Sequence, residues 1–403
     1  MPAKKESKGQ NVWRVCCTNR SEEGYHRTMT ETKQRVGICT MNTGFNYGSS
    51  LQAYALKRTL EQIGYSAEVY RLCGSFIPDR DARRGKIFIM RVRSFLYMRN
   101  QTYPLGAPVH RSKKTISLFH EFYVHILRPE TVCWRELRRR ARRSDYAGFL
   151  CGSDQIWGAN AAYVDPLYFL RFAPQNKRIA FAPSFGAGAI PHWNERIMKR
   201  WIREIPYLSV REESGRKLIL EMTGREAEVL FDPVFLLTKE AWITEFSLTP
   251  HEGRYCLAYF LNEMSDAALA AVNQYSRDGY EIISLPYEET NESMITIDAG
   301  PVEFLRLVYG AEAVLTDSFH ALAFSILFHK PVYAYRKPGA SDSDQPMRLV
   351  NLLQKFGMED CLDRNTVRSC PGDYETADRI MDAERQKSID YLVRSLEAVK
   401  KNS

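Results

Sequence analysis

The sequence predicts an α/β protein whose parallel sheets are divided between two domains. Its 403 residues exceed what one hydrophobic core usually organises, and 44% of them are hydrophobic, enough for two cores. From Arg35 onward, apolar runs of strand length alternate with segments of helical periodicity, a pattern typical of parallel sheets. Residues 238–254 separate two such sets. We therefore expect domains at 35–245 and 246–373, followed by a long charged helix at 374–403.

The first set begins with a strand at 35–41, which leads through a short turn into a helix at 51–65. Leu56, Leu60 and Ile63 share one face of that helix, and Gly64 suits its end. Further strands are expected at 67–72, 147–153, 178–186, 207–212 and 227–233, with a helix at 194–205.

The second set repeats the alternation. Strands are expected at 255–261, 280–287, 313–318 and 331–336, with helices at 265–279, 301–311 and 319–330. Two segments do not fit the pattern. Residues 1–34 are mostly polar and lack periodicity, so we expect a disordered N-terminal extension. Residues 76–145 are basic and aromatic, and are expected to form an insertion in the first domain.

Composition narrows the functional classes. No run of about 18 apolar residues occurs, as a transmembrane helix would need, and residues 1–28 lack the apolar stretch of a signal peptide. None of the nine cysteines forms a CxxC pair. This pattern indicates reduced, mostly buried thiols and a cytoplasmic protein.

Positive charge is concentrated in residues 80–143, which carry a net +13 although the whole chain carries only +8. The densest part is Arg135–Arg143. A solvated helix face is one interpretation, and an anion-binding surface for phosphates or acidic lipid headgroups is the other. No RNP, KH or zinc-finger pattern is present, so nucleic acid is not an expected partner.

Ala313–Lys330 holds the first candidate site. It contains an apolar strand, a polar turn with Ser318, and an apolar helix with His320 in its first turn. Helix N-termini bind anions, and ligands of parallel sheets bind where the strands end. This predicts a titratable imidazole beside an anion site. The alternative is a helix cap next to a packed histidine.

A second candidate lies in the turn that follows the first strand. Gly44 and Gly48 match neither a dinucleotide nor a P-loop fingerprint, so a plain tight turn is the alternative to a ligand-binding loop. Asn46, Tyr47 and Gln52 offer hydrogen-bonding groups there.

Two further turns carry charged groups. Asp154 follows a fully apolar strand and either accepts a proton from a substrate hydroxyl or caps the next turn. Arg211 also ends a strand, where its guanidinium suits a carboxylate or phosphate. The alternative for Arg211 is a structural pair with Glu212 or Glu213. No metal-binding spacing stands out.

These segments, in this order, resemble the polysaccharide pyruvyl transferase family. The matching stretches are GFNYGSSLQAYALKRTLEQIGY, FLCGSDQIW, KRIAFAPSFG, LSVREESG, VLFDPVFLL and VLTDSFHALAFSILFHKPVYAY. The resemblance implies two Rossmann-like domains facing across a cleft, as in GT-B glycosyltransferases. It also implies transfer of the carboxyvinyl unit of phosphoenolpyruvate, as co-substrate without a further cofactor, to a sugar or lipid-linked oligosaccharide. The usual product is a pyruvate ketal.

The resemblance also suggests roles for residues. His320 falls on the family's active-site histidine, and Asp154 is expected to act with it. Arg211 falls on an arginine near the donor's oxyanions. Many members carry arginine two residues before the histidine, where this chain has Ser318. Arg348 and Arg336 are therefore candidates to supply the missing positive charge. The residues expected to bind the donor are Arg211, Ser318, Arg348 and Arg336.

The C-terminal domain is the expected donor side and the N-terminal domain the acceptor side. We expect the basic region 80–143 to face this acceptor side or an anionic membrane. The residues expected to bind the acceptor are Asn46, Tyr47, Gln52 and Gln155. Two other functions remain open at this point. One is a GT-B glycosyltransferase that uses a nucleotide sugar, and the other is a non-catalytic subunit of a polysaccharide assembly.

Overall fold

A computed structural model describes residues 33–42, 44–72, 112–158, 164–186, 188–190, 192–285, 294–336, 346–364 and 372–401. Lys33–Ser403 form one compact unit. The expected disordered extension lies outside the described residues except for Lys33 and Gln34. The first half of the basic segment, up to residue 111, also lies outside them.

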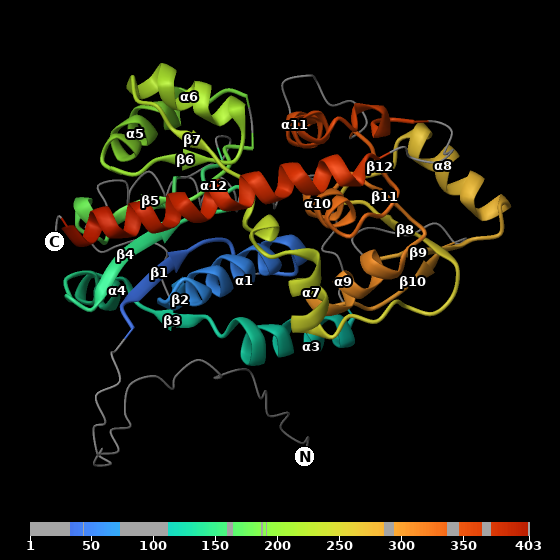
Figure 1. Cartoon of the computed structure of the whole chain (residues 1–403), viewed down its shortest axis with the longest axis horizontal. Coiled ribbons are helices and arrows are strands. Elements are labelled where there is room, and N and C mark those ends of the chain that lie inside the picture. Colours follow the sequence, from blue (N-terminus) through green and yellow to red (C-terminus); the bar gives the residue numbers. More distant parts are fainter. Residues whose placement is uncertain are drawn as a thin grey trace, which may run out of the picture. The chain divides into compact units, whose positions relative to one another are not determined.

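The first sheet consists of five parallel strands in the order β3-β2-β1-β4-β5 (Figure 1). The strands are β1 (Arg35–Cys39), β2 (Ser66–Leu72), β3 (Glu130–Val132), β4 (Tyr146–Cys151) and β5 (Arg178–Ala180). Beyond β5, the short strands β6 (Ser209–Val210) and β7 (Glu228–Val229) pair with each other, and a bridge from Ile179 to Tyr207 joins them to the sheet. The strand order reverses between β1 and β4, and ligands of such sheets bind at this point.

The second sheet has the corresponding order, β10-β9-β8-β11-β12, and is also parallel throughout. Its strands are β8 (Tyr255–Tyr259), β9 (Glu281–Ser284), β10 (Ile295–Thr296), β11 (Ala313–Thr316) and β12 (Val332–Ala334). The order reverses between β8 and β11. The predicted pair of Rossmann-like domains is thus confirmed.

Helices connect these strands and cover the sheets (Figure 1). They are α1 (Tyr47–Gln62), α3 (Lys113–Glu121), α4 (Trp134–Ala141), α5 (His192–Arg203), α6 (Glu213–Thr223), α7 (Lys239–Phe246), α8 (Asp266–Arg277), α9 (Pro301–Gly310), α10 (Phe319–Leu327), α11 (Pro346–Phe356) and α12 (Tyr374–Lys401). The π-helix η1 (Phe122–Leu127) follows α3, and single 3₁₀ turns are η2 (Pro166–Phe169), η3 (Gln175–Lys177), η4 (Pro233–Leu236) and η5 (Glu359–Cys361).

The C-terminal helix α12 contacts both sets of elements. It packs on β4 and η4 from the first set and on α10 and α11 from the second (Figure 1). The buried hydroxyl of Tyr391 donates a hydrogen bond to the carbonyl oxygen of Ala180 at 2.9 Å. This helix therefore ties the end of the chain back to the first sheet.

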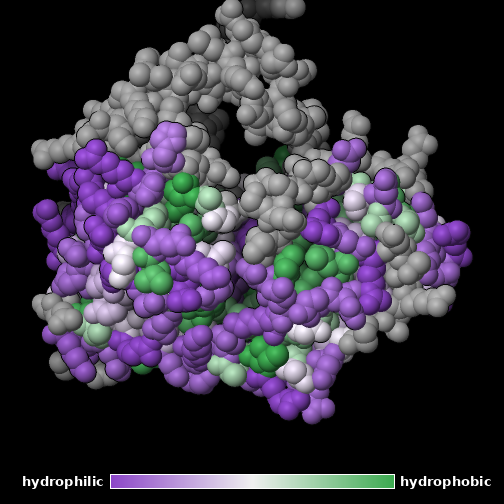
Figure 2. All heavy atoms as spheres, turned by 90° about the horizontal axis from the view of Figure 1, so that it is seen from above, coloured by the Kyte–Doolittle hydropathy of each residue, from purple (hydrophilic) through white to green (hydrophobic). Residues whose placement is uncertain are grey.

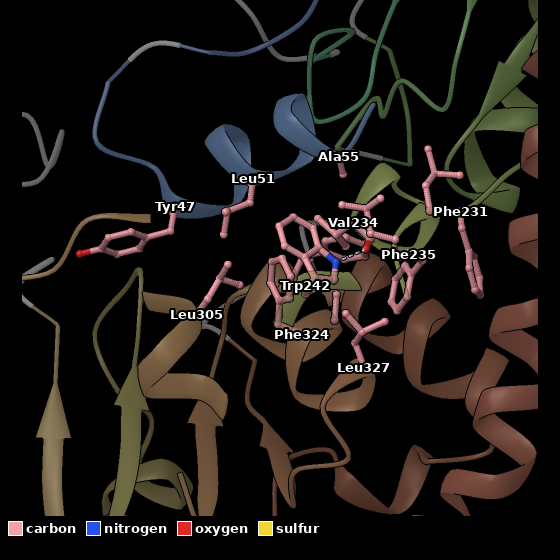
Figure 3. Packing of buried hydrophobic residues seen from close by; sticks show 14 of the residues in the cluster. Tyr47, Leu51, Ala55, Phe231, Val234, Phe235, Trp242, Leu305, Phe324 and Leu327 are labelled. Carbon is pink, nitrogen blue, oxygen red and sulfur yellow. Dashed lines mark hydrogen bonds between the residues drawn. The ribbon is translucent and has the colours of Figure 1, made fainter. Parts of the chain in front are cut away.

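One apolar cluster runs through both sheets' helices. Tyr47 of α1 stacks on Phe304 of α9 with ring centroids 4.9 Å apart. Trp242 of α7 lies edge-on to Phe324 of α10 at 5.1 Å, and its indole nitrogen donates to the carbonyl oxygen of Val234 (Figure 3). The two domains thus share a continuous core, because the faces of α1 and α7 are covered by helices of the second domain.

The structure corrects the expected insertion at 76–145 over its final part. β3 adds a parallel strand to the edge of the first sheet, with Tyr70 opposite Glu130, and α4 follows it as an ordinary crossover helix. Within α4, Arg140 forms ion pairs with Glu68, Glu130 and Glu136. Residues 130–145 therefore belong to the regular domain, and the β-branched residues of a three-residue strand were too few to reveal it.

The cysteines within the described ranges divide into two groups. Cys39, Cys151 and Cys256 are buried free thiols, and Cys133 is an exposed one. Cys361 is disulfide-bonded, so the expectation of reduced thiols is wrong at this position. Spacing alone did not reveal this bond, since a disulfide depends on which segments meet in space.

The described surface carries mostly hydrophilic side chains in the view of Figure 2, with separate small hydrophobic patches between them. None of the helices in the described ranges combines the length and apolar character needed to cross a membrane.

Candidate functional site

The turn between β11 and α10 places His320 at the end of the second sheet's central strands. Ser318 caps α10, since its hydroxyl accepts from the backbone nitrogen of Ala321 at 3.4 Å. The Asp317 carboxylate accepts from the backbone nitrogens of Leu261 and Asn262 at 2.6 and 3.0 Å, which joins the turn to the end of β8. The helix-cap interpretation therefore holds for Ser318.

His320 is buried against α1 at Gly48. A Cβ atom at position 48 would lie 2.0 Å from Cγ and Nδ1 of the imidazole, so only glycine allows this approach. The sequence suggested that Gly48 leaves room for a ligand, but here it leaves room for the histidine. On its other side, Nε2 of His320 lies 3.6 Å from Oδ2 of Asp232. That distance is too long for a hydrogen bond, and Nε2 has no other partner among the residues described.

Asp232 is a buried carboxylate that the sequence analysis did not single out. It caps η4 from the preceding position, where Oδ1 accepts from the backbone nitrogen of Val234 at 3.2 Å. Its Oδ2 accepts from Ser153 Oγ at 3.0 Å and from Arg211 Nη1 at 2.8 Å. Burial opposes ionisation, but His320 and Arg211 outweigh it and hold the pKa of Asp232 below its usual range. An aspartate between an apolar run and a proline was the available signal in VLFDPVFLL.

Arg211 lies in the same cluster and is almost fully buried. Its Nε donates to Oε1 of Glu212 at 3.2 Å, so the predicted structural pair exists, and its guanidinium lies 4.2 Å from the ring centre of Phe319. Burial alone would lower the pKa of Arg211, but Glu212, Asp232 and Asp154 raise it overall. Its Nη2 is buried and has no hydrogen-bond partner within the described ranges. That nitrogen is available to a bound oxyanion.

The loop after β4 brings Asp154 to the start of α1. The Asp154 carboxylate accepts from Ser49 Oγ and from the backbone nitrogen of Gln155 at 2.8 Å. Gln52 holds the two loops together: its amide nitrogen donates to Thr40, Met41 and Ser49, and its oxygen accepts from the Ser153 nitrogen at 3.2 Å. The structure therefore places Asp154 within the cluster and engages Gln52 in supporting it.

Two more of the expected acceptor residues have internal partners. Asn46 caps α1 by accepting from the backbone nitrogen of Ser49 at 2.9 Å. Tyr47 is buried, and its hydroxyl donates to the carbonyl oxygen of Ala299 at 3.4 Å. These contacts explain the fold around α1, while acceptor binding by Asn46, Tyr47 and Gln52 stays a prediction.

A cavity of about 440 Å³ adjoins the cluster, a volume in the range of small-molecule sites. Its walls include Arg211, Glu212, Asp232, Phe319, Arg348 and Lys355. Arg348 comes from α11 in the second domain, and with the amide oxygen of Gln155 turned toward it, that oxygen accepts from both terminal nitrogens at 3.1 Å. Burial, followed by repulsion from Arg211, lowers the pKa of Arg348 to about 10.

Two arginines were expected to supply the positive charge that this chain lacks at Ser318, and the structure brings one of them to the cavity. Arg348 lines it, whereas Arg336 forms an ion pair with Asp363 at the end of β12 and is absent from its walls. Two arginines, three carboxylates and the imidazole of His320 thus meet where the central strands of the two sheets end. In the described part of the chain, no group of three or more His, Cys, Asp or Glu side chains is arranged to hold a metal ion.

Two solved structures with a similar fold share little sequence with this chain. The glycosyltransferase SnogD from Streptomyces nogalater is 12% identical, with 90% of this chain and 100% of that chain covered and a TM-score of 0.45. UDP-GlcNAc 2-epimerase from Methanocaldococcus jannaschii is 14% identical, with coverage of 86% and 92% and a TM-score of 0.42. At such values these likenesses say nothing about activity.

No curated protein matches the chain. The family model described as polysaccharide pyruvyl transferase matches residues 46–336, which include α1, the loop after β4, Arg211, Asp232 and His320. Since the match covers more than half of the sequence, the chain belongs to the polysaccharide pyruvyl transferase family.

Proposed function

We propose that this protein transfers the carboxyvinyl group of phosphoenolpyruvate to two hydroxyls of a sugar, forms a pyruvate ketal and releases phosphate. One observation carries the proposal beyond family membership. Two buried nitrogens of the cluster, Nη2 of Arg211 and Nε2 of His320, have no hydrogen-bond partner among the described residues. Buried polar atoms rarely lack partners, so these two are expected to meet a ligand.

The donor's phosphate and carboxylate require cationic partners. Arg211 from the first domain and Arg348 from the second line the same cavity. Their planar guanidinium groups bind oxyanions through two parallel hydrogen bonds. The first turn of α10, which begins after Ser318, adds backbone N–H groups and the positive end of a helix dipole. Arg336 is a less favourable residue for binding phosphoenolpyruvate, because Asp363 already neutralises its charge.

The chemistry needs one proton delivered and two removed. The first hydroxyl oxygen bonds to C2 of the enol, C3 takes a proton to become a methyl group, and the hydroxyl proton goes to a base. Phosphate then leaves C2 with the electrons of the C–O bond, and the second hydroxyl bonds to C2 and loses its proton. In this proposal His320 acts as the general acid or base, and Asp154 is the nearby carboxylate that accepts a proton from a hydroxyl.

The acceptor is expected to be a sugar of a polysaccharide or of its lipid-linked precursor. Asn46, Gln52 and Tyr47 hold the start of α1, and Gln155 reaches from the neighbouring loop toward Arg348. In this proposal these residues shape the acceptor side, and contact with an anionic membrane through basic α4 brings a lipid-linked acceptor to the protein.

The test is incubation with phosphoenolpyruvate and a panel of sugars and oligosaccharides. Mass spectrometry should show the ketal on an acceptor, and phosphate release should depend on that acceptor. His320→Gln should lower the rate by about 10²–10⁴-fold, the usual effect of losing a general acid or base. Arg211→Lys should act mainly on the affinity for phosphoenolpyruvate, because lysine keeps the charge and loses the planar fork.

His329→Gln is the matched control, since His329 pairs with Asp378 away from the cavity. Transfer from a nucleotide sugar without use of phosphoenolpyruvate would instead establish a glycosyltransferase. Absence of turnover with every donor, in a folded protein, would support the non-catalytic subunit. A His320→Gln variant with the wild-type rate across about pH 6–8 would refute the proposed chemistry.

A further inference from the structure

One oxygen of the site, Oδ2 of Asp232, lies next to three other side chains. It accepts from Arg211 at 2.8 Å and from Ser153 at 3.0 Å, and it faces Nε2 of His320 at 3.6 Å. The carboxylate is fully buried. Asp232 therefore touches both the guanidinium proposed to bind the donor and the imidazole proposed to move a proton.

The cluster's charge depends on the state of His320. Three carboxylates, Asp154, Glu212 and Asp232, face two guanidinium groups, Arg211 and Arg348. With a neutral imidazole the cluster carries one uncompensated negative charge, and with an imidazolium it is neutral. Glu213 and Lys355 also line the cavity, but each pairs with a residue outside the cluster, Arg216 and Glu384 respectively. Asp317, in the turn before α10, accepts hydrogen bonds from Leu261 and Asn262. The helix α10 holds no other titratable side chain, and α1 presents Gly48 to the imidazole.

A bound dianion is repelled by a net negative cluster in a poorly solvated site, and protonation of His320 removes that repulsion. The proton on Nε2 would point at Oδ2 of Asp232, and the 3.6 Å separation needs only a small approach to become a hydrogen bond. Binding and protonation then favour each other by the same factor, because linkage is reciprocal.

We propose that Asp232 is a positioning residue that couples oxyanion binding at Arg211 to proton uptake by His320. The inference rests on the proposed function, in which donor binding would then load the histidine with the proton that C3 receives. It assigns a role to Asp232 and an order of events in which the anion binds first and His320 is protonated second.

Sulfate is the probe, because it stays a dianion over the range in which an imidazole titrates, about pH 5.5–8. Calorimetry on the full chain should show that sulfate affinity rises as the pH falls, by at most about tenfold per pH unit for one linked proton. Titrations in buffers of different ionisation enthalpy should show net proton uptake, and Arg211→Lys should weaken the binding.

Three variants separate coupling from a structural role. Asp232→Asn keeps an acceptor for Val234 but removes the negative charge, so sulfate affinity should lose its pH dependence and equal or exceed that of the wild type near pH 8. His320→Gln should also abolish the dependence. The matched control Asp378→Asn, which removes the carboxylate beside His329, should leave it unchanged.

A purely structural Asp232 would instead make the Asn variant bind more weakly by the same factor at every pH, which would overturn the proposal. A pH-independent wild type, or a His320→Gln variant that keeps the wild-type slope, would overturn it as well. The pH dependence of sulfate binding in the wild type and in His320→Gln tests the proposal even when Asp232→Asn fails to fold. Coupled sulfate binding in a protein that transfers no pyruvyl group would refute the proposed function while leaving the coupling intact.

Discussion

At the scale of single residues, the contact with His320 leaves room only for glycine at position 48. The imidazole occupies the space that any other side chain at position 48 would take. Gly48→Ala should therefore move the ring away from Asp232 and lower turnover strongly, while costing about 1–3 kcal/mol of stability, as overpacking usually does. The measurements are the steady-state rate and the free energy of unfolding in urea.

Gly215→Ala is the control for Gly48→Ala, because Gly215 also lies in a helix and its added Cβ would meet Phe185 at a milder 3.2 Å. It should leave the rate within about twofold, since it lies outside the cluster. A Gly48→Ala enzyme with the wild-type rate would show that the imidazole position observed here is not needed for turnover.

At the scale of elements, Asp317 holds α10 in place by joining its preceding turn to the end of β8. Burial raises the pKa of Asp317, although its three hydrogen bonds from Leu261 and Asn262 act against this. The folded state therefore binds a proton more readily than the unfolded state. Stability should fall as the pH rises from about 4 through the folded pKa, and this slope should vanish in Asp317→Asn.

Asp317→Asn should also cost about 1–3 kcal/mol near neutral pH, because one acceptor oxygen replaces two and a buried donor loses its partner. Urea unfolding at several pH values measures both effects. The same slope in the wild type and the variant would show that another group dominates this range.

Of the basic region 80–143, for which membrane contact is expected, the helix α4 and the two arginines after it hold the densest positive charge. Arg138, Arg139, Arg142 and Arg143 are exposed, and the pairs of Arg139 with Glu136 and Arg143 with Asp145 lie at the surface, where such pairs contribute little. Changing these four to Gln should weaken binding to acidic vesicles, by about 1 kcal/mol for each residue that contacts the membrane, and more at low salt.

Vesicle sedimentation measures this effect. The control is the same change at four exposed arginines elsewhere, namely Arg254, Arg277, Arg379 and Arg394. Equal losses in both variants would mean that net charge alone matters, and no loss in either would leave α4 as a solvated face.

At the scale of the whole molecule, the continuous apolar cluster predicts that the two domains unfold together. Trp242 packs against Phe324 of the second domain (Figure 3), and it also contacts Tyr54 of α1 in the first domain. Trp242→Ala should cost about 3–5 kcal/mol, as is usual for a buried tryptophan. Trp134→Ala, at a half-buried site, should cost less.

Circular dichroism and fluorescence should report one coincident transition for the wild type and for Trp242→Ala. Separate transitions for the two halves of the chain would contradict a shared core.

Much of the architecture followed from local pattern. The predicted strands at 35–41 and 313–318 contain β1 and β11, the predicted strand at 147–153 overlaps all of β4 except Tyr146, and the predicted C-terminal helix contains α12. The first helix begins at Tyr47 rather than at 51, because Asn46 caps it. The predicted strand at 178–186 is longer than the three residues of β5, because its later apolar residues serve a buried loop instead of a ladder.

For the site, local chemistry was enough to find the side chains whose type and place at strand ends are unusual, namely His320, Asp154 and Arg211. Strand periodicity and helix starts depend on near neighbours, which is why a linear sequence reveals them. The role of Gly48, the choice of Arg348 over Arg336, and the central place of Asp232 depend on which distant segments touch. Those contacts arise only when two sheets and their helices bury a common apolar surface, and no local pattern encodes them.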